Sequence, residues 1–254
     1  MVQTVLVVPV YNTLMKYQYI IDFLRTRLAG QPAVIGLSGG VDSAVVAYLV
    51  AKVLPADKIH SFFLPSRTNA AADQVDAEFV AQQLGLALTT IPLEPLLAAY
   101  QQASSDFADG LPLMNLKARV RMTLLYGRAN QCGGMVVGTG NKTELLTGYF
   151  TKYGDGGVDL LPIGGLYKTE VWELAEQLGV PKQVITKIPT AGLREGQTDE
   201  IELGMTYAQL DAILQARAAN QSLDRFPADR VARVAALVSR SGHKLVMPAM
   251  PQPA

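Results

Sequence analysis

The sequence predicts an α/β fold with an open, mostly parallel central sheet and helices on both faces of that sheet. Three observations support this prediction. Short runs rich in apolar residues occur at residues 33–37, 58–64 and 135–139, as in strands that are buried on both faces. Stretches with the apolar period of helices separate these runs. The first and last runs end in glycine-containing turns, at the strand ends where open parallel sheets bind ligands.

The remaining elements follow from apolar period and turn residues. A weaker strand pattern covers residues 86–92 and ends at a proline. The helix that follows the second strand has Val75, Phe79 and Val80 as its apolar positions, and a turn-rich stretch covers residues 104–112. The other helix patterns cover residues 14–28, 44–53, 93–102, 114–128, 167–178, 207–214 and 231–238.

Length and composition indicate a single globular domain. The chain has 254 residues, of which 49% are hydrophobic, and its formal net charge is zero. A neutral chain lacks the bulk positive charge of many nucleic-acid-binding proteins, so we expect no nucleic-acid partner. The single cysteine, Cys132, excludes an internal disulfide framework and is typical of a reducing compartment.

The sequence also gives no sign of a membrane partner. No apolar run is long enough to span a bilayer. The N-terminal run at residues 4–10 is short, contains a proline and has no preceding basic region, which makes it a poor signal peptide. We therefore expect a cytoplasmic protein.

The glycine turn after the first strand is the strongest chemical signal. It reads Ser-Gly-Gly-Val-Asp-Ser over residues 38–43. Glycines let the backbone approach a ligand closely, and the free N–H groups of a helix start favour a phosphate. Ser38 and Ser43 add hydroxyl donors. No lysine follows Gly40, so the turn is not a Walker A loop, and its glycine spacing does not match the dinucleotide fingerprint.

Two carboxylates follow strand ends in this pattern. Asp42 lies inside the glycine turn, and Glu144 follows the strand at 135–139. Because an acid repels bare phosphate, Asp42 indicates a Mg²⁺ ion between the two. Mg²⁺ commonly binds one or two carboxylates together with phosphate oxygens and water. The structural alternative for Glu144 is that it complements the dipole of the helix that it begins.

Three further segments are candidates for substrate contact. Residues 148–166 form a glycine-rich loop whose aromatic and charged side chains argue against disorder. Residues 188–200 are polar and predict a lid, with a plain surface loop as the alternative. The helix at 114–128 either binds an anion or presents a solvated basic face, since it carries Lys117, Arg119, Arg121 and Arg128.

These motifs together resemble a known family. The turn at 38–43 resembles the pyrophosphate loop of the ATP pyrophosphatase superfamily, whose members transfer AMP from ATP to a substrate oxygen. With the blocks at 115–122, 138–168 and 189–204, the chain is similar to ammonia-dependent NAD synthetases over nearly its whole length. The block at 138–168 is the most specific. The resemblance implies the fold of adenine-nucleotide α-hydrolases and one catalytic domain over residues 1–254, with no glutaminase domain.

The resemblance also implies roles for individual residues. Asp42 and Glu144 would bind Mg²⁺, and the catalytic group would be Asp42, Lys168 and Asp155, with Asp155 steering ammonia or the nicotinate ring. ATP would contact Gly36, Leu37, Ser38, Gly39, Gly40, Val41, Asp42, Ser43, Thr139, Lys168 and Thr190. Deamido-NAD would contact Arg119, Lys152, Asp159, His243 and Lys244. Leu245 replaces the arginine that commonly follows this last pair in the family.

The implied reaction joins ammonia to deamido-NAD in two steps. The nicotinate carboxylate attacks the α-phosphorus of ATP, pyrophosphate leaves, and a mixed anhydride with AMP forms. Ammonia then attacks the carbonyl to give NAD⁺ and AMP. Adenylation is necessary because a free carboxylate is a poor electrophile with a poor leaving group. The resemblance implies a homodimer as well.

Free ammonia is the expected nitrogen source, and two other functions compete with this one. Glutamine-using relatives carry a glutaminase domain with a nucleophilic cysteine, whereas Cys132 precedes a buried strand, where a small core residue is expected. Another adenylating pyrophosphate-loop ligase, such as a tRNA-modifying enzyme, would need a nucleic-acid face or relay cysteines. A non-catalytic adenine-nucleotide-binding module would need no carboxylate pair.

Overall fold

The computed structural model describes residues 13–194, 196–248 and 250–251. Within this part of the chain, four parallel strands form one sheet in the order β3-β2-β1-β4. Ala33 pairs with Ile59 on one side and with Met135 on the other, which puts the ends of the two neighbouring strands level with the end of β1. The strands are β1 (Ala33–Gly36), β2 (Ile59–Phe63), β3 (Leu88–Thr90) and β4 (Met135–Val137).

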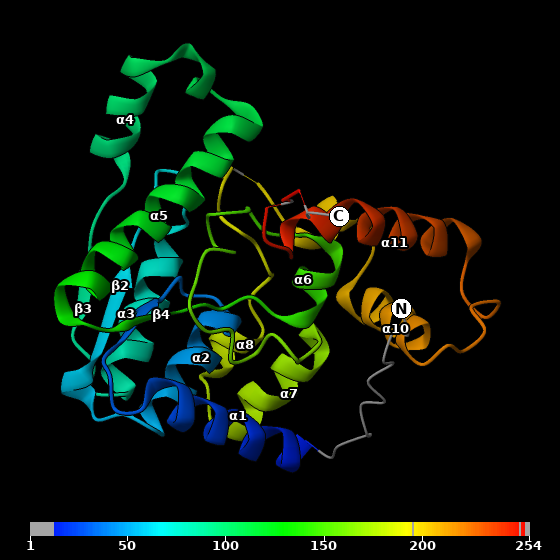
Figure 1. Ribbon diagram of the computed structural model, residues 1–254, viewed down its shortest axis with the longest axis horizontal. Helices are drawn as coiled ribbons and strands as arrows, with labels where there is room; N and C mark the ends of the chain where they lie inside the picture. Colours follow the sequence, from blue (N-terminus) through cyan, green and yellow to red (C-terminus); the bar gives the residue numbers. More distant parts are fainter. Residues whose placement is uncertain (1–12, 195, 249, 252–254) are drawn as a thin grey trace.

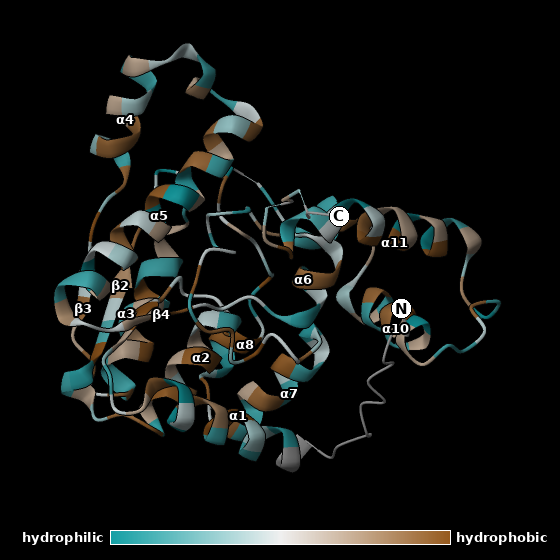
Figure 2. Cartoon of the chain, in the orientation of Figure 1, coloured by the Kyte–Doolittle hydropathy of each residue, from teal (hydrophilic) through white to brown (hydrophobic). Residues whose placement is uncertain are grey.

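Helices cover both faces of the sheet, as the sequence predicts (Figure 1). Side chains alternate along a strand, so Ala33 and Ile35 pack on one face and Val34 on the other. The first face is covered by α1 (Thr13–Leu28), α2 (Val41–Ala51), α3 (Ala71–Gln83), α7 (Lys168–Leu178) and α8 (Lys182–Ile185). The second is covered by α4 (Glu94–Ala103) and α5 (Gly110–Cys132). Hydrophobic residues gather around α2, whereas the outer helices are mixed (Figure 2).

A third apolar cluster joins the C-terminal helices to the sheet domain. Leu203, Leu210 and Val234 are buried together, with α10 packed on α7 and α11 packed on α6. This packing places the end of α11 beside the loop that follows α6. The elements are α6 (Lys142–Thr147), α9 (Asp199–Leu203), α10 (Tyr207–Ala218) and α11 (Ala228–Ser241), with short 3₁₀ helices η1 (Ala56–Lys58), η2 (Ser105–Phe107) and η3 (Gly242–Lys244).

Several boundaries differ from the sequence prediction. Helix α2 begins at Val41 rather than residue 44, so the last residues of the glycine turn form its first turn. Helix α5 begins at Gly110, inside the stretch predicted as turn-rich, and β3 has three residues rather than the seven of 86–92. Gly40 has the β-region backbone conformation that is typical of the residue before a helix, so α2 begins directly after it. The sequence pattern predicts only a turn at this point.

Helix α3 turns a different face to the core than its apolar residues suggest. Val80 is buried, but Val75 is 59% exposed and Phe79 is 37% exposed. The buried polar positions of this helix are Asp73 and Asp76, which pair with a lysine from outside the helix. The inward face of α3 therefore combines the ion-paired aspartates with the buried Ala77, Val80 and Ala81.

The described residues contain no helix with the length and hydropathy that a membrane span needs. The N-terminal run at 4–10 lies outside the described residues, so its interpretation as a poor signal peptide stays a prediction. The Pro/Met-rich tail is described only up to residue 251, with a gap at 249.

Candidate active site

A cavity of about 430 Å³ opens at the carboxyl ends of β1, β2 and β4. The chain runs from β1 to β2 and β3 on one side, and β4 then pairs with β1 on the other side. The strand order therefore reverses beside β1, and ligands bind at such a point in open α/β sheets. The glycine turn, one side of α5, the loop after α6 and the segment 187–193 contribute its walls.

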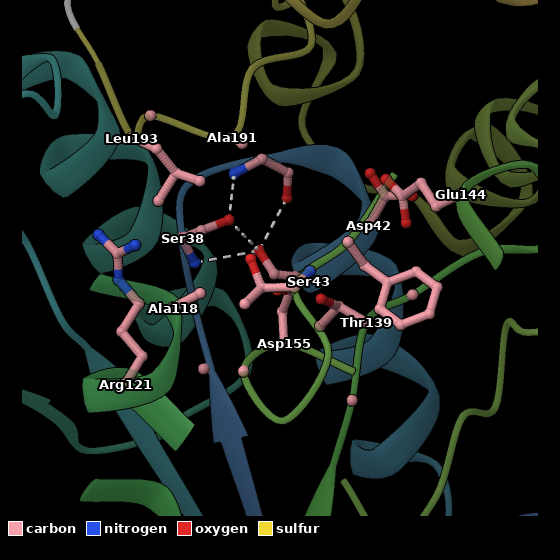
Figure 3. A pocket seen from close by; sticks show the side chains of 18 of the residues that line it. Ser38, Asp42, Ser43, Ala118, Arg121, Thr139, Glu144, Asp155, Ala191 and Leu193 are labelled. Atoms are coloured by element: carbon pink, nitrogen blue, oxygen red, sulfur yellow. Dashed lines mark hydrogen bonds between the residues drawn. The ribbon is translucent and has the colours of Figure 1, made fainter. Parts of the chain in front are cut away.

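Internal hydrogen bonds hold the glycine turn in shape (Figure 3). Ser43 Oγ donates to the Gly40 carbonyl at 2.9 Å, and the Ser38 N–H donates to Ser43 Oγ at 3.1 Å. The Ser38 and Ser43 hydroxyl oxygens lie 3.1 Å apart. No side chain caps the start of α2 at Gly40, so the first N–H groups of that helix are free to face an anion. Apart from Gly39, every residue of 36–43 lines the cavity.

A charged group of three side chains lies beside this turn. The Lys168 ammonium forms an ion pair with the Asp42 carboxylate, whose other oxygen accepts a hydrogen bond from Asn141 Nδ2 at 2.9 Å. Lys168 is only 2% exposed. Burial disfavours its charge, but the nearby Asp42 and Glu144 carboxylates outweigh that effect and raise its pKa. Lys168 is therefore a fixed positive charge at the cavity wall.

Glu144 completes the group from the start of α6. Its carboxylate accepts a hydrogen bond from the Asn141 N–H at 3.0 Å, and the Asn141 side chain accepts one from the Glu144 N–H, so the two form a capping box. Glu144 therefore does stabilise the start of α6, which is the structural role that the sequence allowed as an alternative to metal binding. Burial and then the charge of Asp42 raise the pKa of the Glu144 carboxyl well above its usual range.

The pair Asp42 and Glu144 fits a divalent cation. Both side chains line the cavity, and their mutual repulsion is the second cause of the raised pKa of Glu144. A cation between them would remove that repulsion, and two carboxylates with phosphate oxygens and water are the ligands that Mg²⁺ prefers. The described residues hold no group of three or more His, Cys, Asp or Glu side chains arranged for a metal, so any ion here would depend on ligands from the substrate.

Asp155, in the loop that follows α6, contributes another part of the cavity wall (Figure 3). Its carboxylate accepts a hydrogen bond from the Thr151 N–H at 2.9 Å. Asp155 is exposed at the cavity surface, yet the atoms packed around its carboxyl raise its pKa, while hydrogen bonds from backbone N–H groups and the charges of Arg121 and Lys244 act in the opposite direction. Lys244 lines the same wall and donates to the carbonyls of Gly148 and Phe150, each at 2.6 Å.

Four of the five residues predicted to contact deamido-NAD do not line this cavity, and Lys244 is the exception. Arg119 Nε donates to the Lys152 carbonyl at 3.4 Å, and Lys152 Nζ donates to the His243 carbonyl at 2.6 Å. Arg119, Lys152, His243 and Lys244 thus form a connected group, which we call the basic rim. Asp159 is tied elsewhere, because it accepts hydrogen bonds from the Val136 N–H at 2.7 Å and the Tyr126 hydroxyl at 2.9 Å.

The predicted lid at 188–200 lines part of the cavity through residues 188–193, Gln197 and Asp199. Thr190 lines the cavity and Thr139 faces it from the end of β4. Lys117 of α5 is buried and donates to the Leu193 carbonyl at 2.7 Å, while the Thr68 hydroxyl donates to the Gly192 carbonyl at 2.7 Å. The lid is therefore closed and fastened near its middle.

The basic face of α5 is divided between structure and cavity. Lys117 fastens the lid, whereas Arg121 lines the cavity, donates to the Leu64 carbonyl at 2.9 Å and has a pKa lowered to about 10 by burial. Arg128 contacts His60 at 3.1 Å. The hypothesis of an anion-binding helix therefore concerns Arg121 and the exposed Arg119.

Several cavity residues had no role in the sequence prediction, namely Asp73, Tyr149, Lys187, Asp199 and Glu202. The Tyr149 hydroxyl donates to Glu202 at 2.6 Å and to Asp199 at 3.2 Å. Burial raises the pKa of Asp199, although hydrogen bonds from the Tyr207 and Tyr149 hydroxyls and the charge of Lys168 act in the opposite direction. Tyr149, Asp199 and Glu202 lie within the blocks that carry the family resemblance, but the bonds of Tyr149 span 50 and 53 residues, so local pattern does not reveal them.

Comparison with known protein families, sequences and solved structures gives matches over most of this chain. The family model for NAD synthase matches residues 16–248. An NH(3)-dependent NAD(+) synthetase of Methanosarcina mazei is 47% identical over 245 residues, covering 92% of this chain and 96% of that protein. A solved NH3-dependent NAD synthetase of Campylobacter jejuni is 29% identical, with a TM-score of 0.82 over 95% of this chain and all of that one.

A second solved structure is similar over the same region. It is an NMN synthetase from Francisella tularensis, 36% identical, with a TM-score of 0.86 over 95% of this chain and 99% of that one. The match to the family model covers far more than half of the chain, and the Methanosarcina protein exceeds 30% identity over most of both chains. This chain therefore belongs to the NAD synthase family.

Proposed function

We propose that this chain is an ammonia-dependent NAD synthetase, which converts deamido-NAD, ATP and ammonia into NAD⁺, AMP and pyrophosphate. The observation that carries the proposal is the group of Asp42, Glu144 and Lys168 beside an uncapped helix start. A family that forms C–N bonds by adenylation needs such a group to hold a triphosphate and its metal. The NH(3)-dependent relative of high identity supports the same reaction.

In the adenylation step, this chain positions ATP and balances its charge. The N–H groups at the start of α2 and the hydroxyls of Ser38 and Ser43 bind the departing pyrophosphate, and Lys168 offsets its negative charge. Mg²⁺ held by Asp42 and Glu144 would supply further positive charge. The nicotinate carboxylate then attacks the α-phosphorus, the bond to pyrophosphate breaks, and the acyl adenylate forms.

In the amidation step, ammonia attacks the acyl carbonyl and AMP leaves with the bonding electron pair. The closed lid keeps water from the anhydride, since Lys117 and Thr68 hold it over the cavity. Asp155 faces the same cavity, and its raised pKa suits a group that accepts a proton from an incoming ammonium ion. The NH(3)-dependent relative of high identity supports ammonia as the nitrogen donor.

The basic rim supports deamido-NAD as the second substrate. Arg119, Lys152 and His243 lie next to Lys244 at the edge of the cavity, where they suit the phosphates of a dinucleotide. Nicotinate mononucleotide is the second candidate substrate, because the similar Francisella protein is an NMN synthetase and only Lys244 of the predicted contacts lines the cavity. Deamido-NAD has a second nucleotide that could reach the rim, whereas nicotinate mononucleotide has none.

The test is an assay of the purified protein with Mg²⁺ and ATP. Deamido-NAD or nicotinate mononucleotide is supplied with either ammonium or glutamine, and amide product and AMP are both quantified. We expect NAD⁺ from ammonium, one AMP for each NAD⁺, and a higher kcat/KM for deamido-NAD than for the mononucleotide. A higher kcat/KM for the mononucleotide would reverse the substrate assignment. ATP cleavage without either amide would favour another ligase, and no ATP cleavage at all would favour a binding module.

The remaining expectations are also proposals. We propose a single catalytic domain without a glutaminase, a homodimer, and a cytoplasmic location without membrane or nucleic-acid partners, on the basis of the family resemblance and the neutral net charge. Light scattering after size-exclusion chromatography gives the mass in solution. A mass of twice 27.3 kDa is expected, and a monomer that is fully active would contradict the dimer.

A further inference from the structure

Lys187 connects three parts of the molecule that no sequence motif links. Its ammonium lies 2.8 Å from Asp73 Oδ1 and 2.6 Å from Asp76 Oδ2, both on α3. It also donates to the Gly39 carbonyl at 3.3 Å, in the pyrophosphate loop. Lys187 immediately precedes the lid at 188–200 and lines the cavity. Burial disfavours its charge, but hydrogen bonds to the two aspartates outweigh this and raise its pKa, so it stays a cation.

The contact with Lys187 fixes the orientation of one peptide group. The C=O and N–H of a trans peptide point in opposite directions, so a Gly39 carbonyl that faces Lys187 sends the Gly40 N–H the other way. That N–H donates a hydrogen bond to Ser38 Oγ, with 3.3 Å between nitrogen and oxygen, and both Gly40 and Ser38 line the cavity. A reversed peptide would present a carbonyl oxygen to the phosphates and remove an N–H donor.

The surroundings of Gly39 leave little room for the loop to move. Gly39 has φ +80°, and a Cβ added there would lie 2.2 Å from the Asp73 carbonyl oxygen. The loop thus sits directly on the first turn of α3. Asp73 also accepts a hydrogen bond from the Ala70 N–H at 3.1 Å, and Asp76 accepts one from Gln183 at 3.0 Å. The aspartates that bind Lys187 are therefore held by other contacts.

We propose that Lys187 is a positioning residue for ATP, which holds the Gly39–Gly40 peptide with its N–H toward the triphosphate and ties this geometry to the start of the lid. Lys187 acts through the loop rather than on phosphate, because its ammonium is already bound by two carboxylates. The inference rests on the proposed binding of ATP by the loop at 38–43.

The first test compares Lys187→Gln and Lys187→Arg with the wild-type enzyme. For Lys187→Gln we expect the KM for ATP, and the Kd for a non-hydrolysable ATP analogue with Mg²⁺, to rise about tenfold. The KM for deamido-NAD should stay within about twofold, since the basic rim is not involved. Lys187→Arg should recover most of the loss. The matched control is Lys182→Gln on α8, an exposed lysine of similar position in the chain.

The second test separates positioning from direct phosphate contact. Asp76→Asn weakens the hold on Lys187 at a residue that does not line the cavity. Positioning predicts a weaker Kd for the ATP analogue, by about threefold, whereas direct contact predicts an unchanged or tighter Kd because a competing negative charge is gone. The double variant Lys187→Gln/Asp76→Asn keeps the local charge balanced, so it should fold and still bind ATP weakly.

Melting temperatures without ATP report folding for every variant. An unchanged Kd in Lys187→Gln, in a folded protein, would overturn the inference, and so would tighter binding in Asp76→Asn. Failure of the wild-type protein to bind the ATP analogue would instead overturn the proposed function, so the two failures are distinguishable.

Discussion

The two ends of the cavity are built in different ways. At the pyrophosphate loop, charges are buried and paired before any substrate arrives: Lys168 binds Asp42, and Lys187 binds Asp73 and Asp76. At the basic rim, Arg119 and His243 are exposed, the side chains of Arg119 and Lys152 donate to backbone carbonyls, and the Lys152 ammonium also lies over the Tyr153 ring. The charges at the first end are buried or half-buried and held in ion pairs, whereas those at the second end are half-buried or exposed and donate to backbone carbonyls.

We expect the pyrophosphate-loop end of the cavity to serve the chemical reaction and the basic rim to serve substrate binding. Fixed charges stabilise charge that develops in a transition state at little reorganisation cost. Exposed charges are screened by solvent and contribute modestly to binding. We therefore expect substitutions at the pyrophosphate loop to reduce turnover, and substitutions at the rim to change the KM for one substrate.

The largest effect should come from the two carboxylates of the loop end. Asp42→Asn and Glu144→Gln keep the hydrogen bonds with Asn141 but remove a negative charge that would hold Mg²⁺. We expect NAD⁺ formation to fall about a hundredfold or more in each variant. The measurement is NAD⁺ and AMP against Mg²⁺ concentration, with the exposed Asp57→Asn as control. Wild-type turnover in either variant would show that its carboxylate is not needed for the reaction.

A smaller effect concerns stability against pH in the absence of Mg²⁺ and ATP. Burial and the charge of Asp42 raise the pKa of Glu144 in the folded chain, so the folded state binds more protons than the unfolded state between the usual carboxyl pKa and the raised one. Stability from this group is present below the usual pKa and declines as pH rises through the raised pKa.

Glu144→Gln removes that dependence. Above the raised pKa of Glu144, the variant should melt a few degrees higher than the wild type, about 2 to 4 °C, and the difference should vanish in acid. Thermal unfolding from acid to neutral pH measures both. Subtracting the two curves removes the contributions of Asp155, Asp199 and Asp211, whose pKa values are also raised by burial. A constant difference across pH would show that Glu144 does not titrate as described.

The difference between the two ends of the cavity also explains which parts of the site could be predicted from the sequence. The loop end follows from local pattern: Ser38 to Ser43 are contiguous, and parallel strands bring Glu144 and Asp42 to one sheet edge. Contacts between distant segments leave no such signal. Lys187 lies 111 residues from Asp76, and Tyr149 lies 53 residues from Glu202. Helix α3 shows the same limit, because its apolar residues Val75 and Phe79 face solvent while its aspartates face inward.

Asp159 is the position where family resemblance and structure point to different kinds of role. The resemblance implies contact with deamido-NAD, but its carboxylate accepts bonds from the Val136 N–H and Tyr126 and lies outside the cavity wall. The sequence around Asp159 does not show which groups its carboxylate binds. The substrate contact therefore stays a prediction, and the rim offers the way to test it.

The smallest effect should come from the rim. Arg119→Gln and Lys152→Gln should each raise the KM for deamido-NAD about threefold and leave the KM for ATP unchanged, since these exposed charges act on one substrate through water. Salt should shrink the difference from wild type. Asp159→Ala should instead lower the melting temperature, because it removes the acceptor of the Val136 N–H that supports β4.

Comparing deamido-NAD with nicotinate mononucleotide as substrates makes the test of the rim more specific. If the rim binds the adenylate half of deamido-NAD, the rim variants should leave the KM for nicotinate mononucleotide unchanged, because that substrate has no second half to reach Lys152. Equal losses for both substrates would mean that Arg119 and Lys152 support the cavity wall through their bonds to Lys152 and His243 carbonyls rather than bind a dinucleotide. The distinction between a catalytic end and a recognition end would then fail at the rim, while the carboxylate variants would still test it at the loop.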